Sequence, residues 1–366
     1  MGGSSFGKQF KITTWGESHG KAIGVVIDGV PAGLSLSEED LIPFLAIRRP
    51  GANPYGTKRM ESDLPEILSG TFEGITTGTP ISIMIRNESQ ISKDYTNIAH
   101  VYRPGHADYT FDQKYGIRDY RGGGRSSGRE TAARVAAGAI ASKILSSLGI
   151  EVMAYTHSIG SITIKEDTIT PEKIYASPIY MPDMTASADA MSYLDDCIKK
   201  QDSCGGIVGC IVKNMPVGIG ETVFDKLDAQ LAKAIMSIGA VKAFEIGDGI
   251  KASRSYGSQN NDAFYMDGNN IKKKTNHSGG ILGGMSDASD ILIKAHFKPT
   301  PSISLAQETV TTSKKDTTIN IHGRHDPVIV PRGVVVVESM VCITILDLLL
   351  ENMSAKLSSI QDFYNK

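Results

Sequence analysis

Residues 23–34 read IGVVIDGVPAGL, and residues 208–219 read VGCIVKNMPVGI. Both stretches place an apolar, largely β-branched run before a Pro-x-Gly step, which is typical of a buried strand that ends in a tight turn. A helix is expected to follow each turn. The shared rhythm indicates that one structural unit occurs twice in the chain.

A weaker echo follows each of these stretches in the same order. Residues 74–75 lead to an apolar run at 81–83, and residues 284–285 lead to a similar run at 291–293. We interpret the chain as an internal duplication of a strand, turn, helix and strand unit, with approximate halves 1–185 and 186–366 in one domain. Chance similarity between two buried strands is the alternative.

Composition limits the class of protein. The chain has 366 residues, 40% of them hydrophobic and 21% charged, which indicates a soluble globular protein with a large core. Its net charge of -2 favours neither nucleic acid nor an anionic membrane as a partner. The four cysteines form no C-x-x-C pair, so we expect a reducing, cytoplasmic location without disulfides or a zinc site.

The most apolar segment, Val334–Leu350, contains the acidic residues Glu338 and Asp347. We therefore predict a buried strand followed by a helix here, and not a membrane span. The N-terminus has no apolar run like that of a signal peptide, and Phe6 stands where a myristoylation motif needs Ser or Thr.

The Gly- and Arg-rich segment Arg121–Thr131 runs directly into an Ala-rich, apolar stretch at 132–141. That stretch predicts a helix buried on nearly every side. Ser127 and Glu130 have the spacing of a capping box, so the glycines should lie at the helix N-terminus, where free N–H groups attract anions. A capped structural helix with surface arginines is the alternative.

His106 follows Pro104 and Gly105, which predict a sharp turn that holds the imidazole outside any helix. An unperturbed histidine titrates near neutral pH, and neighbouring arginines lower its pKa. His106 is therefore a candidate for proton transfer, with a solvated loop histidine as the alternative.

The segment Gly16–Gly20 matches the G-x-S-x-G pattern, which would make Ser18 the nucleophile of a serine hydrolase. That motif requires a turn from a strand to a helix. Here a second strand is expected to follow, so the hydrolase is our second hypothesis.

Two further segments are polar loops. Residues 322–327 contain His322, His325 and Asp326, but their spacing does not indicate a metal site, and Arg324 would repel a cation. We expect no metal. The loop 298–302 offers one cation, two prolines and two hydroxyls, which suit a cofactor ring or a phosphate.

The segments around His19, His106, Arg125 and Asp326 closely resemble the chorismate synthase family, in order and over essentially the whole chain. This resemblance implies an α+β fold: a duplicated β-α-β sandwich with central helices between antiparallel sheets. It also implies a homotetramer and reduced FMN as the cofactor. The implied reaction is an anti 1,4-elimination of phosphate from 5-enolpyruvylshikimate 3-phosphate, the last step of the shikimate pathway before aromatic amino acid biosynthesis branches.

The resemblance also implies roles for matching residues. His106 would protonate the reduced flavin, His19 the departing phosphate, and Asp326 would assist proton removal, with Ser18 and Ser126 nearby. The implied flavin contacts are Arg125, Ser126, Ser127, Gly239, Ala240, Gly283, Lys298, Pro299, Thr300, Pro301, Ser302 and Arg324. Partners for the substrate or NADP are Arg48, Arg49, Arg59, Arg103 and Arg129, because guanidinium groups bind carboxylates and phosphates bidentately.

One position departs from the family. Pro54 stands where many bacterial members carry an arginine, and proline offers neither a charge nor an N–H donor. We expect Arg59 to compensate. No G-x-G-x-x-G fingerprint is found between a strand and a helix, so NADPH is expected to act only as an indirect reductant of the flavin.

Overall fold

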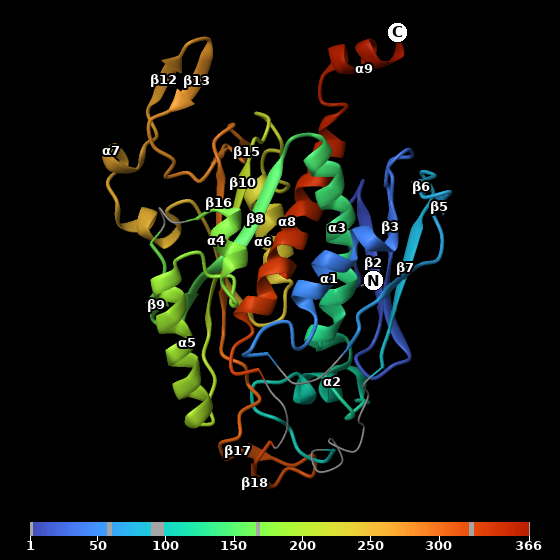
Figure 1. The fold of residues 1–366 in the computed structure, drawn as a ribbon, viewed down its shortest axis with the longest axis vertical. Coiled ribbons are helices and arrows are strands. Elements are labelled where there is room, and N and C mark those ends of the chain that lie inside the picture. Colours follow the sequence, from blue (N-terminus) through green and yellow to red (C-terminus); the bar gives the residue numbers. More distant parts are fainter. Residues whose placement is uncertain (1–2, 57–60, 89–98, 166–168, 322–325, 366) are drawn as a thin grey trace.

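The computed structural model describes residues 3–56, 61–88, 99–165, 169–321 and 326–365. Within them the chain forms two five-stranded antiparallel sheets, and helices fill the space between the sheets (Figure 1). This arrangement confirms the α+β class and the central helices that the sequence and its resemblance predicted.

The first sheet is built entirely from the N-terminal part of the chain, in the order β1-β2-β3-β7-β4. Its inner strands show the alternation of a half-buried strand, with Ile81, Ile83 and Ile85 of β7 buried against the helices. The strands are β1 (Ser5–Phe6), β2 (Lys11–Gly16), β3 (Ala22–Asp28), β7 (Ile81–Arg86) and β4 (Pro65–Ile67).

The second sheet has the order β11-β16-β10-β8-β9. Its central strand β10 pairs antiparallel with β16 on one side and β8 on the other. The strands are β11 (Val241–Ile246), β16 (Ile291–Phe297), β10 (Gly206–Lys213), β8 (Glu151–Ile159) and β9 (Ile162–Thr163). Because β8 and β9 precede residue 186, this sheet draws on both predicted halves.

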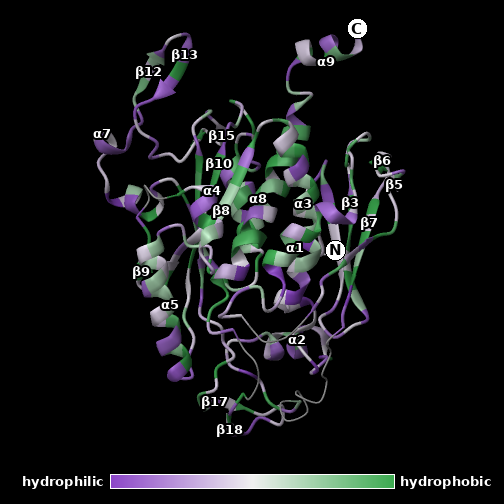
Figure 2. Cartoon of the chain, in the orientation of Figure 1, coloured by the Kyte–Doolittle hydropathy of each residue, from purple (hydrophilic) through white to green (hydrophobic). Residues whose placement is uncertain are grey.

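Two long helices, α3 (Thr131–Ser147) and α8 (Val330–Asn352), lie side by side between the sheets (Figure 1). Both are coloured as hydrophobic along most of their length, whereas the outer helices carry hydrophilic faces (Figure 2). Gly138 of α3 allows close contact with α8, because a Cβ there would lie 2.2 Å from Cβ of Ser339. The shorter helices α1 (Ile42–Arg48) and α6 (Leu227–Met236) also contact α8.

The remaining elements lie outside the two large sheets and the four helices that pack between them. The helices are α2 (Asp108–Tyr115), α4 (Pro171–Ala176), α5 (Met184–Lys199), α7 (Gly257–Asn260) and α9 (Leu357–Tyr364). The described residues also form the small hairpins β5–β6 (Thr71–Phe72, Ile75–Thr76), β12–β13 (Phe264–Asp267, Asn270–Lys273), β14–β15 (Ile281–Leu282, Met285–Ser286) and β17–β18 (Gln307–Val310, Asp316–Ile319).

The prediction of a strand followed by a helix at Val334–Leu350 is wrong, because the whole segment belongs to α8. The sequence is rich in β-branched residues, but burial on every side stabilises the helix regardless of propensity. In the described part of the chain, α8 alone is long and apolar enough to span a membrane, and 89% of its apolar stretch is buried inside the protein.

The two Pro-Gly turns of the sequence repeat make the same hydrogen bonds. Gly33 N donates to Thr76 O at 2.9 Å, and Gly218 N donates to Ser286 O at 2.8 Å. The hydroxyls of Thr76 and Ser286 donate in turn to the carbonyls of Pro31 and Pro216. We propose on this basis that the chain arose by internal duplication.

Candidate active site

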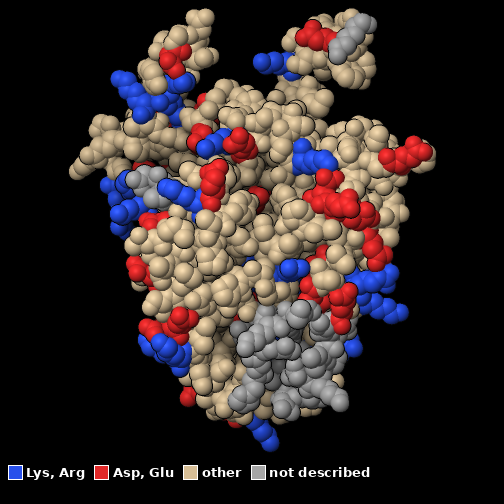
Figure 3. All heavy atoms as spheres, in the orientation of Figure 1, with Lys and Arg blue, Asp and Glu red and all other residues tan. Residues whose placement is uncertain are grey.

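A cleft of about 1080 Å³ is lined by the first turns of both α3 and α8. Loops from both sheets converge on it, at 17–19, 103–108, 117–131, 237–240 and 298–302. The positive ends of two helix dipoles therefore point toward one cavity, which favours an anionic ligand. The outer surface is different, since acidic and basic side chains are interspersed over the face in Figure 3.

His106 borders the cleft with a defined tautomer. Its Nδ1 lies 2.9 Å from the carbonyl oxygen of Pro104, which can only accept, so Nδ1 carries the proton. The hydroxyl of Ser302 donates to Nε2 at 2.9 Å. The turn that the sequence predicted at 104–105 thus fixes the imidazole between two loops that are distant in the chain.

The pKa of His106 is lowered from 6.5 to about 4, because burial and then the charge of Arg103 disfavour the imidazolium. Arg103 itself is held by Asp108 in a bidentate ion pair, with N···O distances of 2.8 and 2.7 Å. His106 is thus neutral at neutral pH in the free protein. An anion bound nearby would raise its pKa again.

His19 is buried beside Ser18, with its Nδ1 3.0 Å from the serine Oγ. Gly122 makes this position available, because a Cβ there would lie 2.2 Å from His19 Nδ1. The first glycine of the Gly-Arg segment therefore leaves the space that the His19 imidazole occupies. Ser18 sits between β2 and β3, two antiparallel neighbours, so the strand-to-helix turn of a hydrolase is not formed.

The Gly-Arg segment forms two short turns that lead into α3. Ser127 Oγ accepts from the N–H of Arg129 as a cap, but the reciprocal half of the predicted capping box is wrong. Glu130 instead accepts from Thr14 at 2.8 Å and from Arg134 at 2.9 Å. The Thr14 partner is not evident from the sequence because it belongs to β2, whereas Arg134 lies four residues after Glu130 in the first turn of α3.

Arg125 reaches back to the first sheet, where it donates to Thr14 Oγ1 at 2.7 Å and to the carbonyl of Gly16 at 3.1 Å. Ser126 and Ser127 line the cleft beside it. The sheet thus holds Arg125, while Ser126 N–H and its hydroxyl donate to the carbonyl of Gly123 within the segment.

On the opposite wall, Lys298 donates to the carbonyl of Gly105 at 3.0 Å. Burial, followed by repulsion from Lys242, lowers its pKa. Thr300, Pro301 and Ser302 also line the cleft, as do Gly239 and Ala240. Among the described residues, Thr300 Oγ1 is buried without a hydrogen-bond partner.

The predicted anion-binding arginines fall into two groups. Arg48, Arg103 and Arg129 border the cleft, but each is already paired with a carboxylate of the protein. Arg49 is exposed and does not line the cleft. Pro54 is likewise exposed outside it, and Arg59 lies outside the described residues.

Asp326 lines the cleft opposite the Gly-Arg segment and accepts from Arg332 at 2.7 Å. Arg332 and Arg134 were missed by the sequence reasoning, although both border the cavity. Both could have been found from the sequence, because each is an arginine in the first turn of an otherwise apolar helix. Pro299 and Gly283 do not line the cleft of this single chain, and Arg324 lies outside the described residues.

The fold and the cleft together define an α+β protein with a cationic cavity, two buried or half-buried histidines and hydroxyl-bearing loops, which suits an enzyme acting on an anionic small molecule. In the described part of the chain, no group of three or more His, Cys, Asp or Glu side chains could hold a metal ion.

Comparison with known proteins identifies the family. A sequence model of chorismate synthase matches residues 10–350. The chorismate synthase of Agathobacter rectalis is 60% identical over 366 residues, which cover 100% of both chains. That of Methanococcoides burtonii is 52% identical over 351 residues, 95% of this chain and 96% of the relative. A crystal structure of chorismate synthase matches with a TM-score of 0.77 at 31% identity, covering 98% of each chain.

The chain therefore belongs to the chorismate synthase family. It is accordingly a carbon–oxygen lyase of the shikimate pathway, as the resemblance predicted. The serine hydrolase hypothesis finds no support, either in the relatives or in the strand-turn-strand setting of Ser18.

Proposed function

We propose that the cleft binds reduced FMN together with 5-enolpyruvylshikimate 3-phosphate and eliminates phosphate in the anti 1,4 sense to give chorismate. The observation that carries the proposal is the cavity itself, which receives two helix N-termini and is ringed by arginines. A volume of about 1080 Å³ exceeds the usual upper size for one drug-like ligand, so it has room for a cofactor and a small substrate.

The residues present fit FMN on one side of the cleft. The buried Thr300 hydroxyl still has a donor and acceptor to satisfy, and a polar cofactor group would do so. The hydroxyl of Ser127 and the backbone around Gly239 add donors for a phosphate or a ring carbonyl, and Ser126 lies beside them. When bound, reduced FMN supplies the electron density for cleaving an unactivated C–H bond without net redox change.

The chain's own groups then handle protons and charge. His106 is neutral in the free protein, and the negative charge of the ligands would raise its pKa so that it can hold and donate a proton. His19 is proposed to protonate the leaving phosphate. The carboxylate of Asp326, held by Arg332, is proposed to accept the substrate proton at the end of its transfer. General acid catalysis of this kind contributes about two to four orders of magnitude.

The arginines that border the cleft are proposed to orient the substrate rather than to react. Arg134 donates to Glu130 and to Ser237, which leaves its guanidinium fixed at the start of α3. Arg129 and Arg103 are fixed by carboxylates in the same way. Such preorganised cations hold carboxylate and phosphate groups without being reordered on binding.

The test is an anaerobic assay of chorismate and phosphate formation. We expect turnover with photoreduced FMN, without stoichiometric consumption of the flavin. Activity of the apo-protein, or of oxidised FMN under air without a reductant, would contradict the proposal. A change in the flavin spectrum when substrate is added to oxidised FMN would support binding of both at one site.

Assembly, reductant and location follow from the family as further parts of the proposal. We propose a homotetramer in the cytoplasm, with no nucleic acid or membrane partner. NADPH is proposed to act only through a separate flavin reductase. Rapid anaerobic reduction of bound FMN by NADPH alone would contradict this, and sedimentation at the mass of one chain would contradict the tetramer.

A further inference from the structure

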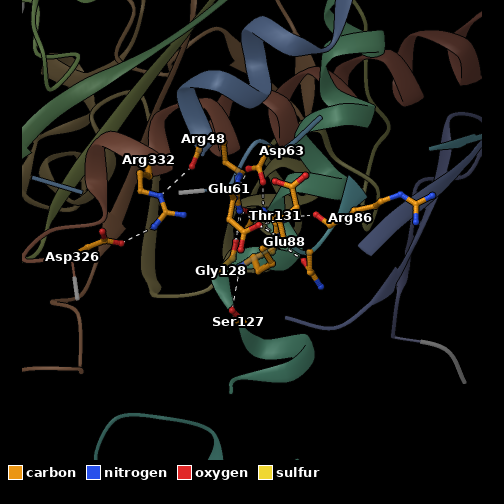
Figure 4. A network of polar contacts seen from close by, with 12 residues as sticks. Arg48, Glu61, Asp63, Arg86, Glu88, Ser127, Gly128, Thr131, Asp326 and Arg332 are labelled. Carbon is orange, nitrogen blue, oxygen red and sulfur yellow. Dashed lines mark hydrogen bonds and ion pairs between the residues drawn. The ribbon is translucent and has the colours of Figure 1, made fainter. Parts of the chain in front are cut away.

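Asp63 belongs to the polar network drawn in Figure 4. Its side chain is fully buried, and each carboxylate oxygen binds a different arginine. Oδ2 accepts from Arg48 Nη2 at 2.9 Å, and Oδ1 accepts from Arg129 Nη1 in a short contact. Asp63 therefore sets the distance between two guanidinium groups that border the cleft.

The network extends from Asp63 in two directions. Arg48 also donates to the carbonyl of Gly128 at 3.0 Å, which fixes the turn just before α3. The carbonyl of Arg48 accepts from Arg332 Nε at 3.1 Å, and Arg332 in turn binds Asp326 at 2.7 Å (Figure 4). Asp63 is thus linked to Asp326 through two intermediate residues, Arg48, by its side chain and its carbonyl, and Arg332.

The electrostatics require a carboxylate at this point. Arg48 is buried, and its pKa is lowered to about 10 by burial and by the neighbouring Arg332 and Arg129. Asp63 opposes that repulsion. Glu61 is another acid of this network, but it lies 3.9 Å from Arg129. Without the charge of Asp63, the buried Arg48 would lose its ion-pair partner while Arg129 and Arg332 remain beside it, and an unpaired buried charge is costly.

The backbone at Asp63 adds an independent observation. Its φ is +50°, in the left-handed region that a residue with a side chain rarely adopts. Conformations of this kind persist where the surroundings over-determine them, and they cluster at functional sites.

We propose that Asp63 is a positioning residue for the lyase reaction: its carboxylate sets the guanidinium of Arg129 for the anionic substrate and, through Arg48 and Arg332, orients Asp326. This inference rests on the proposed function of the cleft. Asp63 does not line the cavity, so it acts through the arginines and not by contact with the substrate.

The test compares Asp63→Asn with Asp347→Asn in the full-length protein. Asp347 is also a buried carboxylate, and it accepts three backbone N–H groups from residues 8–10. It lies about 25 Å along α8 from the start of that helix, at 1.5 Å per residue. Both changes are expected to lower the thermal midpoint. For the folded fraction, only Asp63→Asn should raise the KM for the phosphorylated substrate and lower kcat, each by about tenfold or more.

Equal KM and kcat values for folded wild type and Asp63→Asn would overturn the proposal. If Asp63→Asn does not fold, Asp63→Glu decides, since it keeps the charge and moves it by one methylene. A folded Asp63→Glu enzyme with wild-type KM and kcat would also overturn the proposal, whereas a raised KM supports it. The wild-type protein is assayed in parallel with reduced FMN, and its inactivity would count against the proposed function itself.

Discussion

The Oγ of Ser302 lies 2.9 Å from Nε2 of His106, although the two residues are 196 positions apart in the chain. The contact joins the loop that follows β16 of the second sheet to the loop that precedes α2. Because the Pro104 carbonyl fixes the other ring nitrogen, the two bonds together set both the tautomer and the orientation of the imidazole.

Replacing His106 should therefore reduce turnover strongly. For His106→Ala we expect kcat to fall by about a hundredfold or more, as is usual for loss of a proton-transfer group, with flavin affinity largely retained. Ser302→Ala retains the imidazole of His106 but removes one of the two hydrogen bonds that orient it. The kcat of this variant should therefore fall less than that of His106→Ala. Steady-state kinetics and flavin titration measure both, and near-normal turnover of His106→Ala would assign the histidine a purely structural role.

The lowered pKa of His106 makes a separate prediction about stability. Its folded value of about 4 lies below the unfolded value near 6.5, so between these pH values the unfolded chain binds the proton and the native protein does not. The contribution of His106 is complete above the upper value and is lost as pH falls toward the lower one. This loss amounts to about 2 kcal/mol at pH near 5.

The measurement is the midpoint of denaturant unfolding as a function of pH. As the pH is lowered from neutral to about 5, the free energy of unfolding should fall less for His106→Gln than for the wild type. His100→Gln serves as the control, because His100 is exposed. Parallel curves for wild type and His106→Gln would show that the imidazole is not buried in its neutral form.

Gly122 is expected to be essential because of its contact with His19, and not because of anion binding at the N-terminus of α3. A methyl group there would lie 2.2 Å from His19 Nδ1 and 3.0 Å from Ser18 Oγ, so Gly122→Ala must displace the histidine. We expect a loss of kcat similar to that of His19→Ala, about a hundredfold or more. Gly257→Ala, where the added methyl meets open space, is the matched control. Normal turnover of Gly122→Ala would show that catalysis does not require His19 at this position.

These cases show where sequence reasoning reached its limit. The repeated strands and the Gly-Arg segment could be predicted because their signals are local: alternation, a Pro-Gly step, and glycines before an apolar helix. The pairing of Arg129 with Asp63 could not, since the two residues are 66 positions apart. In α8 the local signal itself misled, because a Val-rich run fits a buried strand and a buried helix equally well.

The packing of α3 against α8 gives the last prediction, which concerns stability alone. Gly138 faces Ser339, and a Cβ on Gly138 would lie 2.2 Å from the serine Cβ and 2.6 Å from its Cα. Backbone atoms cannot rotate away, so Gly138→Ala has to separate the two helices. Overpacking of this kind costs about 1–3 kcal/mol, which outweighs the gain of up to about 1 kcal/mol expected for Ala over Gly inside a helix.

We therefore expect a lower free energy of unfolding for Gly138→Ala in denaturant titrations, with the catalytic constants of the folded enzyme almost unchanged. Ser339→Gly in the same chain should restore part of the loss, because it removes the Cβ and the hydroxyl that the new methyl meets. An increase in stability for Gly138→Ala alone would mean that α3 and α8 are not packed this closely in solution.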